Sequence, residues 1–347
     1  MTAPRDPTAG LARATLLHKL GGYVETQLIA YFAALGVADH MAAGPLPVQL
    51  LAAALNLPPD RCMRLVRGWV LVGLLQADSA GYLTATPLGR ILAADHPDSL
   101  REYACLAGEV WYPAWAALAE VGIAERPPFV AVFGATYYDY LAQNPVAGAR
   151  FQRFMDMRTV QTAAALGGTY DFTHARTVVD LGGGQGTLVS TLLQTYPHLH
   201  GMVFDHPAET SACASQLAEA GVATRCEVVT GDFFADPLPL GDHYILSQIL
   251  HNWDDAACRQ LLRQVRRAIP EDGVLLIIEY LLPPQLMAPP AVVEADLMML
   301  VLLGGRERTE AAYAALLADS GFTLAGVQPL HRLGFSLLTV TPNKEFL

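Results

Sequence analysis

A histidine stands where an expected strand ends. The apolar run 244–250 is typical of a buried strand, and His251 follows it directly, with Trp253 and the acids Asp254 and Asp255 behind it. Histidine has an ordinary pKa near neutrality, so it can take a proton from an attacking hydroxyl, such as a phenol with a pKa of about 10. We interpret His251 as a candidate general base. The two acids are expected to cap the following helix, where carboxylates stabilise free backbone N–H groups.

Glycines follow a second expected strand in a pattern that suits a ligand. The sequence from Asp180 reads D-x-G-x-G-x-G, and its glycines Gly182, Gly184 and Gly186 lie between an expected strand and an expected helix. Glycine lets the chain turn sharply and leaves room for a ligand against the backbone. A dinucleotide fingerprint would need its third glycine one residue later. The observed spacing resembles the S-adenosylmethionine loop of Rossmann-like methyltransferases.

Two further strand ends also carry acids. Asp205 closes the run 200–205, where a carboxylate can accept hydrogen bonds from both hydroxyls of a ribose. Asp232 closes the run 226–232 and is suited to accept a hydrogen bond from an adenine amine, with Phe233 packing on the ring. A single carboxylate at a strand end is often only a helix cap. Acids at three successive strand ends of one sheet, in contrast, indicate a binding site.

The elements that must position these residues alternate between strands and helices. Helical segments such as 186–196 and 254–269 separate the strands, which predicts a parallel sheet covered on both faces. We therefore expect an α/β, Rossmann-like fold. Segments 322–330 and 334–342 are expected to form a terminal hairpin. The other expected strands are 176–184, 200–205, 226–232, 243–250 and 273–282.

The first hundred residues are expected to be mainly helical. A helix at 61–74, opened by Pro59 and Asp60, is followed by a hairpin signal around 78–81, which is a winged-helix arrangement. Such modules often bind DNA, but seven basic residues here face seven acidic ones, whereas a groove-reading module carries a net basic patch. The very apolar first helices favour a subunit interface. We expect homodimerisation through this part, with DNA binding as the alternative.

Composition and charge exclude several classes of protein and of binding partner. The chain has 347 residues, 52% apolar and 16% charged, which can bury a large core in one or two domains. Its formal net charge of −11 argues against nucleic acid as a partner.

The five cysteines are scattered, and no metal motif such as H-E-x-x-H occurs, so we expect no disulfide framework and no metal. We expect a cytoplasmic protein with no membrane partner, since neither a signal peptide nor an apolar stretch of about 18 residues is recognisable. The scarcity of lysine hints at a bacterial genome.

Taken together, the motifs resemble those of a known family along nearly the whole chain. They are V-V-D-L-G-G-G-x-G at 178–186, F-D-x-P at 204–207, G-D-F-F at 231–234, H-N-W-D-D at 251–255 and G-G-R-E-R-T-E at 304–310. The family is the S-adenosylmethionine-dependent small-molecule O-methyltransferases, of the plant caffeate and isoflavone type and their bacterial natural-product relatives. The resemblance implies S-adenosylmethionine as cofactor. It also implies a class I methyltransferase sheet at 105–347 behind an N-terminal winged-helix dimerisation domain at 1–104.

The resemblance also implies roles for single residues. The histidine of H-[D/N]-W is the family's catalytic base, here His251, and two acids orient its imidazole. Glu279 matches the first acid, and Glu307 is favoured for the second, with Glu310 as the alternative. Many plant members hold the cofactor with a lysine four residues before the histidine. This chain has Ser247 there, which can form hydrogen bonds but brings no charge.

The acceptor pocket is expected to come from the linker 105–170 and a late helix. The linker is rich in aromatic residues and methionine, which bind flat rings through apolar and sulfur contacts. In the family an F-x-x-x-M segment places a methionine against the substrate ring, and Phe151 and Met155 match it. The other candidates are Trp111, Trp115, Tyr138, Met298 and Met299.

We therefore predict in-line methyl transfer from S-adenosylmethionine to a hydroxyl of an aromatic secondary metabolite. Three alternatives remain open: N-methylation, a non-methylating activity of the same family (hydroxylation, decarboxylation or cyclisation), and a DNA-binding regulator. Retention of His251 weighs against the second, because such members need no methyl-transfer base. The sequence does not specify which ring or which hydroxyl is methylated.

Overall fold

The computed structural model describes residues 7–122, 126–207, 209–330 and 334–344. These residues form two compact units, each discontinuous in sequence. The first comprises Met1–Ala116 and Asn144–Phe154, and the second comprises Ala117–Gln143 and Met155–Leu347. The first unit therefore takes in part of the segment 105–170, and helix α10 (Pro145–Thr169) contributes to both units.

The first unit is mainly helical, as its sequence predicts. The predicted hairpin is present as β2 (Leu75–Ala77) and β3 (Tyr82–Ala85), which pair antiparallel around an Asp78 turn. The Asp78 carboxylate closes this turn by accepting the backbone N–H groups of Ala80 and Tyr82, each at 2.9 Å. The α-helices of the unit are α1 (Pro7–Leu20), α2 (Gly22–Ala34), α3 (Val48–Ala54), α4 (Pro59–Leu71), α5 (Pro87–Arg90), α6 (Arg101–Leu106) and α7 (Tyr112–Ala116). A short π-helix, η2 (Ala107–Trp111), connects α6 to α7.

The second unit is built on one seven-stranded sheet with the order β11-β12-β8-β7-β4-β5-β6. Its strands are β4 (Thr177–Leu181), β5 (His200–Asp205), β6 (Cys226–Thr230), β7 (His243–Ser247), β8 (Val274–Glu279), β11 (Phe322–Pro329) and β12 (Ser336–Pro342). The first five pair parallel with one another, which confirms the predicted parallel sheet. The predicted terminal hairpin is also present, and its strand β12 joins the sheet antiparallel to β8.

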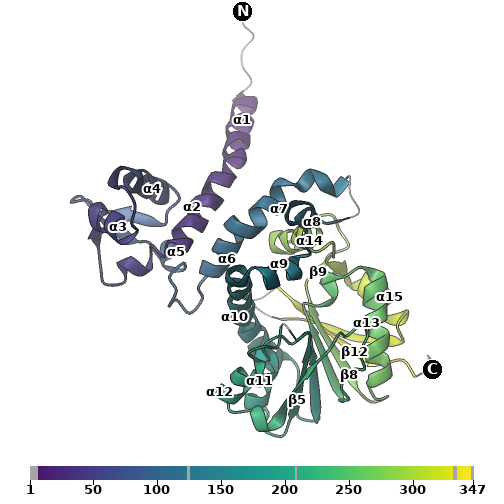
Figure 1. Cartoon of the computed structure of the whole chain (residues 1–347). Coiled ribbons are helices and arrows are strands. Elements are labelled where there is room, and N and C mark those ends of the chain that lie inside the picture. Colours follow the sequence, from purple (N-terminus) through teal and green to yellow (C-terminus); the bar gives the residue numbers. More distant parts are fainter. Residues whose placement is uncertain (1–6, 123–125, 208, 331–333, 345–347) are drawn as a thin grey trace, which may run out of the picture. The chain divides into compact units, whose positions relative to one another are not determined.

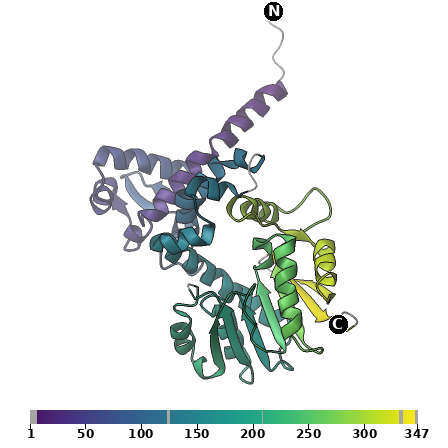
Figure 2. The same cartoon turned by 45° about the vertical axis from the view of Figure 1, so that its right-hand side comes forward.

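Helices cover both faces of this sheet. Figures 1 and 2 show α11 (Thr187–Thr195) and α12 (Cys213–Glu219) on one side, with α13 (Asp255–Ala268) and α15 (Glu310–Ala318) on the other. Each face has its own buried apolar cluster. The remaining helices are α8 (Pro128–Phe133), α9 (Tyr137–Gln143) and α14 (Pro290–Leu302), with short turns at η3 (Leu118–Gly122), η4 (Ala223–Arg225) and η5 (Leu250–Asn252). The architecture is thus the expected α/β one.

The strand that precedes His251 is shorter than predicted. It ends at Ser247 instead of Leu250, because Gln248 takes a left-handed conformation with φ of 57°, which a strand does not allow. The chain then enters the turn η5, which contains His251. The turn moves the histidine out of the sheet while keeping it at the carboxyl end of β7.

Among the described residues, no helix combines the length and the apolar character that crossing a membrane requires.

Candidate active site

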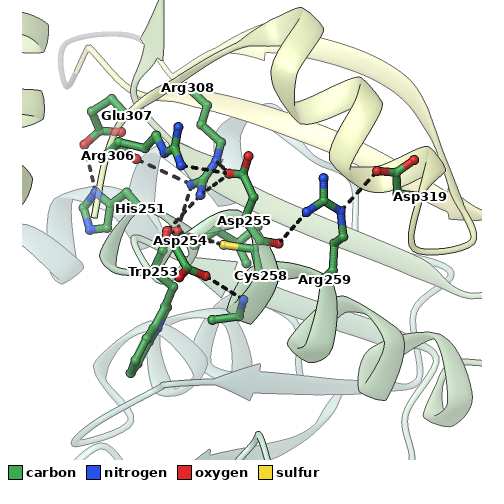
Figure 3. Close-up of polar contacts among 12 residues, drawn as sticks. His251, Trp253, Asp254, Asp255, Cys258, Arg259, Arg306, Glu307, Arg308 and Asp319 are labelled. Carbon is green, nitrogen blue, oxygen red and sulfur yellow. Dashed lines mark hydrogen bonds and ion pairs between the residues drawn. The ribbon is translucent and has the colours of Figure 1, made fainter. Parts of the chain in front are cut away.

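His251 lies in a nearly closed environment, with 8% of its surface exposed. Its Nδ1 is 2.8 Å from Glu307 Oε1 and 3.4 Å from Glu279 Oε2. Since Nδ1 is held by a carboxylate, the proton on the neutral ring is fixed there, and Nε2 is left as the basic nitrogen. No hydrogen bond to Nε2 occurs within the described part of the chain. Figure 3 shows the contact between His251 and Glu307.

The two glutamates are brought to His251 by a short parallel strand pair. Glu279 ends β8 and is separated from β9 (Leu281–Leu282) by Tyr280, whereas Glu307 directly precedes β10 (Arg308–Thr309), and β9 pairs with β10. Both side chains are buried, with exposures of 0% for Glu279 and 2% for Glu307. The structure thus places the favoured acid, Glu307, beside the imidazole. Glu310 instead begins helix α15.

Burial and charge act against each other on these groups. Burial disfavours the charged imidazole, but the carboxylates of Glu279 and Glu307 outweigh it and raise the pKa of His251 above its ordinary value. Burial, reinforced by Glu307, raises the pKa of Glu279 to about 7. The site therefore favours a charged imidazole, which is what a general base becomes after it has taken a proton.

Backbone contacts fix the two segments around His251. Glu279 Oε1 accepts the backbone N–H of Leu250 at 2.8 Å and that of His251 at 3.3 Å. In the opposite direction, the backbone N–H of Arg306 donates to the carbonyl of His251 at 2.8 Å. Gly305 allows this approach, because a Cβ there would lie 2.0 Å from the same carbonyl oxygen. The loop that bears Glu307 therefore lies directly against the backbone of His251.

These three side chains could in principle hold a cation. Within the described ranges, His251, Glu279 and Glu307 are the one group of three such residues whose ligating atoms all lie within 4.8 Å of one another. Both carboxylates face the same ring nitrogen, and 2.8 Å between Nδ1 and Oε1 is a direct hydrogen-bond distance. A cation would have to replace the proton held there. Metal independence stays a prediction.

The glycines of the loop after β4 serve different purposes. Gly182, Gly184 and Gly186 all have positive φ, at 74°, 53° and 80°. A Cβ on Gly182 would meet Ile249 Cδ1 at 2.3 Å, so that glycine is needed for packing. A Cβ on Gly184 would meet nothing within 4 Å. Gly184 therefore exposes its backbone to open space, as a loop that cradles a ligand must.

Two acids surround this loop. Asp205 Oδ2 accepts the backbone N–H of Gly184 at 2.9 Å, and burial raises the pKa of Asp205. Asp180 is 2% exposed, and its Oδ2 has no hydrogen-bond partner among the described residues. Burial and the nearby Asp205 raise the pKa of Asp180 to about 7. An unsatisfied buried carboxyl beneath an open glycine loop fits a ligand with an ammonium group, such as the amino-acid end of S-adenosylmethionine.

The third acid lies in a more open setting. Asp232 is exposed, and its Oδ1 accepts the backbone N–H of Phe234 at 2.8 Å, which holds the turn after β6. Phe233 packs edge-on against Phe234 and Trp253, with ring centroids 4.8 and 6.3 Å away. Their roles toward adenine stay predictions, as does that of Ser247, which is half-buried at the end of β7.

The predicted acceptor residues are divided between the two units. Trp111, Trp115 and Phe151 belong to the first unit, whereas Tyr138, Met155, Met298 and Met299 belong to the second. Within the second unit, the hydroxyl of Tyr138 accepts a hydrogen bond at 3.4 Å from the side chain of Asn252, the residue that follows His251. Met298 and Met299 lie on α14, the helix whose Asp296 accepts the backbone N–H of Glu307 at 2.9 Å. The pocket as a whole stays a prediction.

Comparison with known proteins decides the family. A family profile described as O-methyltransferase domain matches residues 115–323. The chain belongs to the O-methyltransferase family. It is 39% identical over 327 residues to the phenazine O-methyltransferase of Lysobacter antibioticus, covering 94% of this chain and 95% of that one. It is 36% identical over 336 residues to the O-demethylpuromycin-O-methyltransferase of Streptomyces alboniger, covering 95% and 89%.

A solved O-methyltransferase of similar fold has both a methyl donor and an aromatic compound bound. An O-methyltransferase from neocarzinostatin biosynthesis, in complex with S-adenosylmethionine and 2-hydroxy-5-methyl naphthoic acid, is similar with a TM-score of 0.80 and 31% identity. The match covers 92% of this chain and 96% of that one. The chain described here is an S-adenosylmethionine-dependent O-methyltransferase, with the class I methyltransferase sheet that the sequence predicts.

Several residues of this O-methyltransferase site had no role assigned from sequence. The most prominent are Gly305, Arg308 and Asp296, which hold the Glu307 loop and the His251 turn. Gly305 and Arg308 lie inside the motif G-G-R-E-R-T-E, so their position was visible, but their contacts cross about fifty residues of sequence. Asp255 was expected to cap helix α13, and this is wrong: Asp254 is the cap, accepting Ala257 N–H at 2.8 Å, while Asp255 pairs with Arg308.

Proposed function

We propose that this enzyme methylates a hydroxyl on an aromatic secondary metabolite, with His251 as general base and Glu279 and Glu307 as the acids that orient it. The observation that carries the proposal is the buried contact of 2.8 Å between His251 Nδ1 and Glu307 Oε1, with Glu279 Oε2 at 3.4 Å. The named activities of the relatives, on a phenazine and on O-demethylpuromycin, support this acceptor class. A hydroxyl acceptor needs such a base, because most of it is protonated at neutral pH.

The residues of the chain divide the work of the reaction. Bound S-adenosylmethionine supplies a methyl group on a positively charged sulfur. The loop at Gly184, with Asp180 and Asp205, holds the amino-acid and ribose parts of that molecule. His251 Nε2 takes the proton of the acceptor hydroxyl, and the two carboxylates at Nδ1 stabilise the imidazolium that forms. Alignment of the attacking oxygen with the methyl group supplies much of the remaining acceleration.

The test of this proposal is transfer of labelled methyl to matched acceptors. A panel of phenols and hydroxylated heteroaromatics, each paired with the corresponding amine, is incubated with enzyme and labelled S-adenosylmethionine, with and without EDTA. We expect product from a hydroxyl acceptor, with the label on oxygen and the same rate in EDTA. Transfer to the amines alone would replace the proposal with N-methylation. Cofactor binding without transfer to any acceptor would favour a non-methylating activity, and inhibition by EDTA would overturn metal independence.

The cofactor cradle is tested through Asp205. We expect Asp205→Ala to weaken binding of S-adenosylmethionine by about 10- to 100-fold, because it removes a partly buried acceptor of ribose hydrogen bonds and frees Gly184 N–H. Isothermal titration calorimetry measures this loss. The matched control is Asp171→Ala, since Asp171 is an exposed acid whose carboxylate accepts hydrogen bonds from Thr173. Equal affinity of the two variants would show that Asp205 does not hold the cofactor.

We also propose that the enzyme is a cytoplasmic homodimer formed through the first unit. The large apolar side chains of its first two helices support this, because Leu11, Leu20 and Tyr23 are 73%, 62% and 57% exposed. Such a surface is normally covered by a partner. All five cysteines are free, which fits a reducing compartment.

A further inference from the structure

One buried guanidinium connects the base to the loop that orients it. Arg308 follows Glu307 directly, and its side chain is 3% exposed. Its Nη1 donates to the carbonyls of Leu250 at 3.0 Å and Arg306 at 3.5 Å, while Nη2 donates to that of Trp253 at 2.8 Å. Nε and Nη2 also donate to Asp255 Oδ1, at 3.0 and 2.8 Å. All five N–H groups of the guanidinium are therefore used.

The acceptors of these hydrogen bonds are placed on both sides of the reacting pair. The carbonyls of Leu250 and Trp253 bracket His251, and that of Arg306 precedes Glu307. Figure 3 shows the guanidinium between His251 and Glu307 on one side and Asp255 on the other. The group thus ties two backbone segments to each other at the point where their side chains meet.

We propose that Arg308 is a positioning residue for methyl transfer, which holds the His251 turn and the Glu307 loop together so that Nδ1 and Oε1 remain in contact. The inference rests on the proposed function, since it concerns His251 as the base. Asp255 is the counter-charge that lets the guanidinium be buried, and Arg308 in turn lowers the pKa of Asp255 despite partial burial of that carboxyl. Arg308 touches no reacting atom in this proposal and acts through the geometry of the pair.

The fork of donors explains why the position needs arginine. A lysine would keep the positive charge and could pair with Asp255, but an ammonium has three donors in a compact group. It cannot reach carbonyls on two segments and a carboxylate together. Arg308→Lys therefore preserves the charge of the site while releasing part of the connection between the two segments.

The experiment compares matched pairs of variants. Arg308→Lys is compared with Arg306→Lys. The Arg306 side chain is 55% exposed, and its Nη2 lies 3.8 Å from Asp255 Oδ1, beyond hydrogen-bond distance. The hydrogen bond from the backbone N–H of residue 306 to the carbonyl of His251 is kept in this variant. Asp255→Asn is set against Asp254→Asn, because asparagine also caps a helix well. For each variant we measure kcat against pH, the Kd for S-adenosylmethionine and the folded fraction by thermal unfolding.

We expect Arg308→Lys and Asp255→Asn to lower the plateau value of kcat per folded enzyme by about 10- to 100-fold, because small misplacements of catalytic groups have effects of that size. The Kd for S-adenosylmethionine should not change. The two control variants should keep the native plateau. A role confined to stability would lower the folded fraction and leave kcat per folded enzyme unchanged, which would overturn the proposal.

The pH profile gives a second readout that stability does not move. Among the residues that the structure describes, the charged groups that act on His251 are Glu279 from β8, Glu307 from the loop after α14 and Arg158 from α10. The two carboxylates raise the pKa of His251, and Arg158 lowers it. Loosening the Glu307 contact should lower the pKa of His251 and move the acid limb of the kcat profile to lower pH. An acid limb at the native pH in Arg308→Lys would contradict the proposal.

A double-mutant cycle separates this inference from the proposed function. If Arg308 acts through the Glu307 contact, Arg308→Lys should lower kcat much less in a Glu307→Ala background, which lacks that contact, than in the native enzyme. Equal losses in both backgrounds would overturn the positioning role. Failure of the proposed function has a different signature: His251→Ala would then keep native kcat, whatever Arg308→Lys does.

Discussion

Substituting His251 with alanine is expected to lower kcat for a hydroxyl acceptor by about 10²- to 10⁴-fold, the usual contribution of a general base. The loss arises because the acceptor must otherwise attack as a neutral hydroxyl or be deprotonated by water. The two carboxylates at Nδ1 would lose their shared partner as well. Binding of S-adenosylmethionine should be retained, because the loop at Gly184 follows β4, whereas His251 lies in the turn after β7.

The control for this variant lies on β7, the strand that leads to the His251 turn. His243 is buried to the same degree as His251, begins β7, and contacts Asp242 and Tyr170 through its two ring nitrogens. Because it lies at the opposite end of the strand, His243→Ala should reduce stability but leave kcat per folded enzyme near the native value. Radiolabel transfer on both variants, with cofactor affinity measured in parallel, checks the expectation. Native kcat in His251→Ala would rule out this residue as the base and would indicate a nitrogen or an already ionised acceptor.

The sequence predicted the parts of this fold that depend on local pattern. The strand and helix alternation after residue 176 is confirmed, as are the terminal hairpin and the hairpin at Asp78. Hydrophobic periodicity and turn residues determine structure within about ten positions, so these elements can be predicted from one sequence alone. The placement of acids at strand ends could also be inferred, because parallel strands put their carboxyl ends on one edge.

What the sequence could not give were contacts set by tertiary packing. Nothing local distinguishes Asp254 from Asp255, yet one caps a helix and the other pairs with Arg308, fifty-three positions further on. The left-handed turn at Gln248, which ends β7 early, is equally hidden, because a β-like apolar pattern continues through it to Leu250. Gly305 is informative only once the carbonyl of His251 is seen 2.0 Å from its missing Cβ.

The second large effect is expected at the two glutamates. Glu307→Gln and Glu279→Gln keep the shape of each side chain, and their amide oxygens can still accept the same N–H groups. Each removes one negative charge from beside Nδ1, so the imidazolium formed during transfer is less stable. If the pKa of His251 falls by one unit, the equilibrium constant for forming the imidazolium falls by about tenfold. We expect kcat to fall by about this factor or more in each variant.

The sign of the accompanying pH shift follows from the carboxylates. In the native enzyme they raise the pKa of His251, so His251 as the proposed base should be neutral and active only above that raised value, and kcat should fall as pH drops through it. Removing either carboxylate lowers this pKa, and the acid limb of the profile should move to lower pH. A limb that stays in place would show that these acids do not set the charge state of the base.

Stability should change in the opposite direction to activity in Glu279→Gln. The pKa of Glu279 is raised to about 7, so the folded protein binds this proton more tightly than the unfolded chain does. Its contribution to stability is complete below the ordinary pKa of a glutamate and is lost as pH rises toward 7, because ionisation then leaves a second charge in the buried site. Glutamine cannot ionise, so Glu279→Gln should melt at a higher temperature than the native enzyme at pH 8, and the difference should shrink at pH 5.

A variant that is slower yet more stable at high pH would show that the charge of Glu279 promotes catalysis and destabilises the folded protein. A variant that is destabilised at both pH values would mean that its hydrogen bonds to Leu250 and His251, and not its charge, are what the site requires.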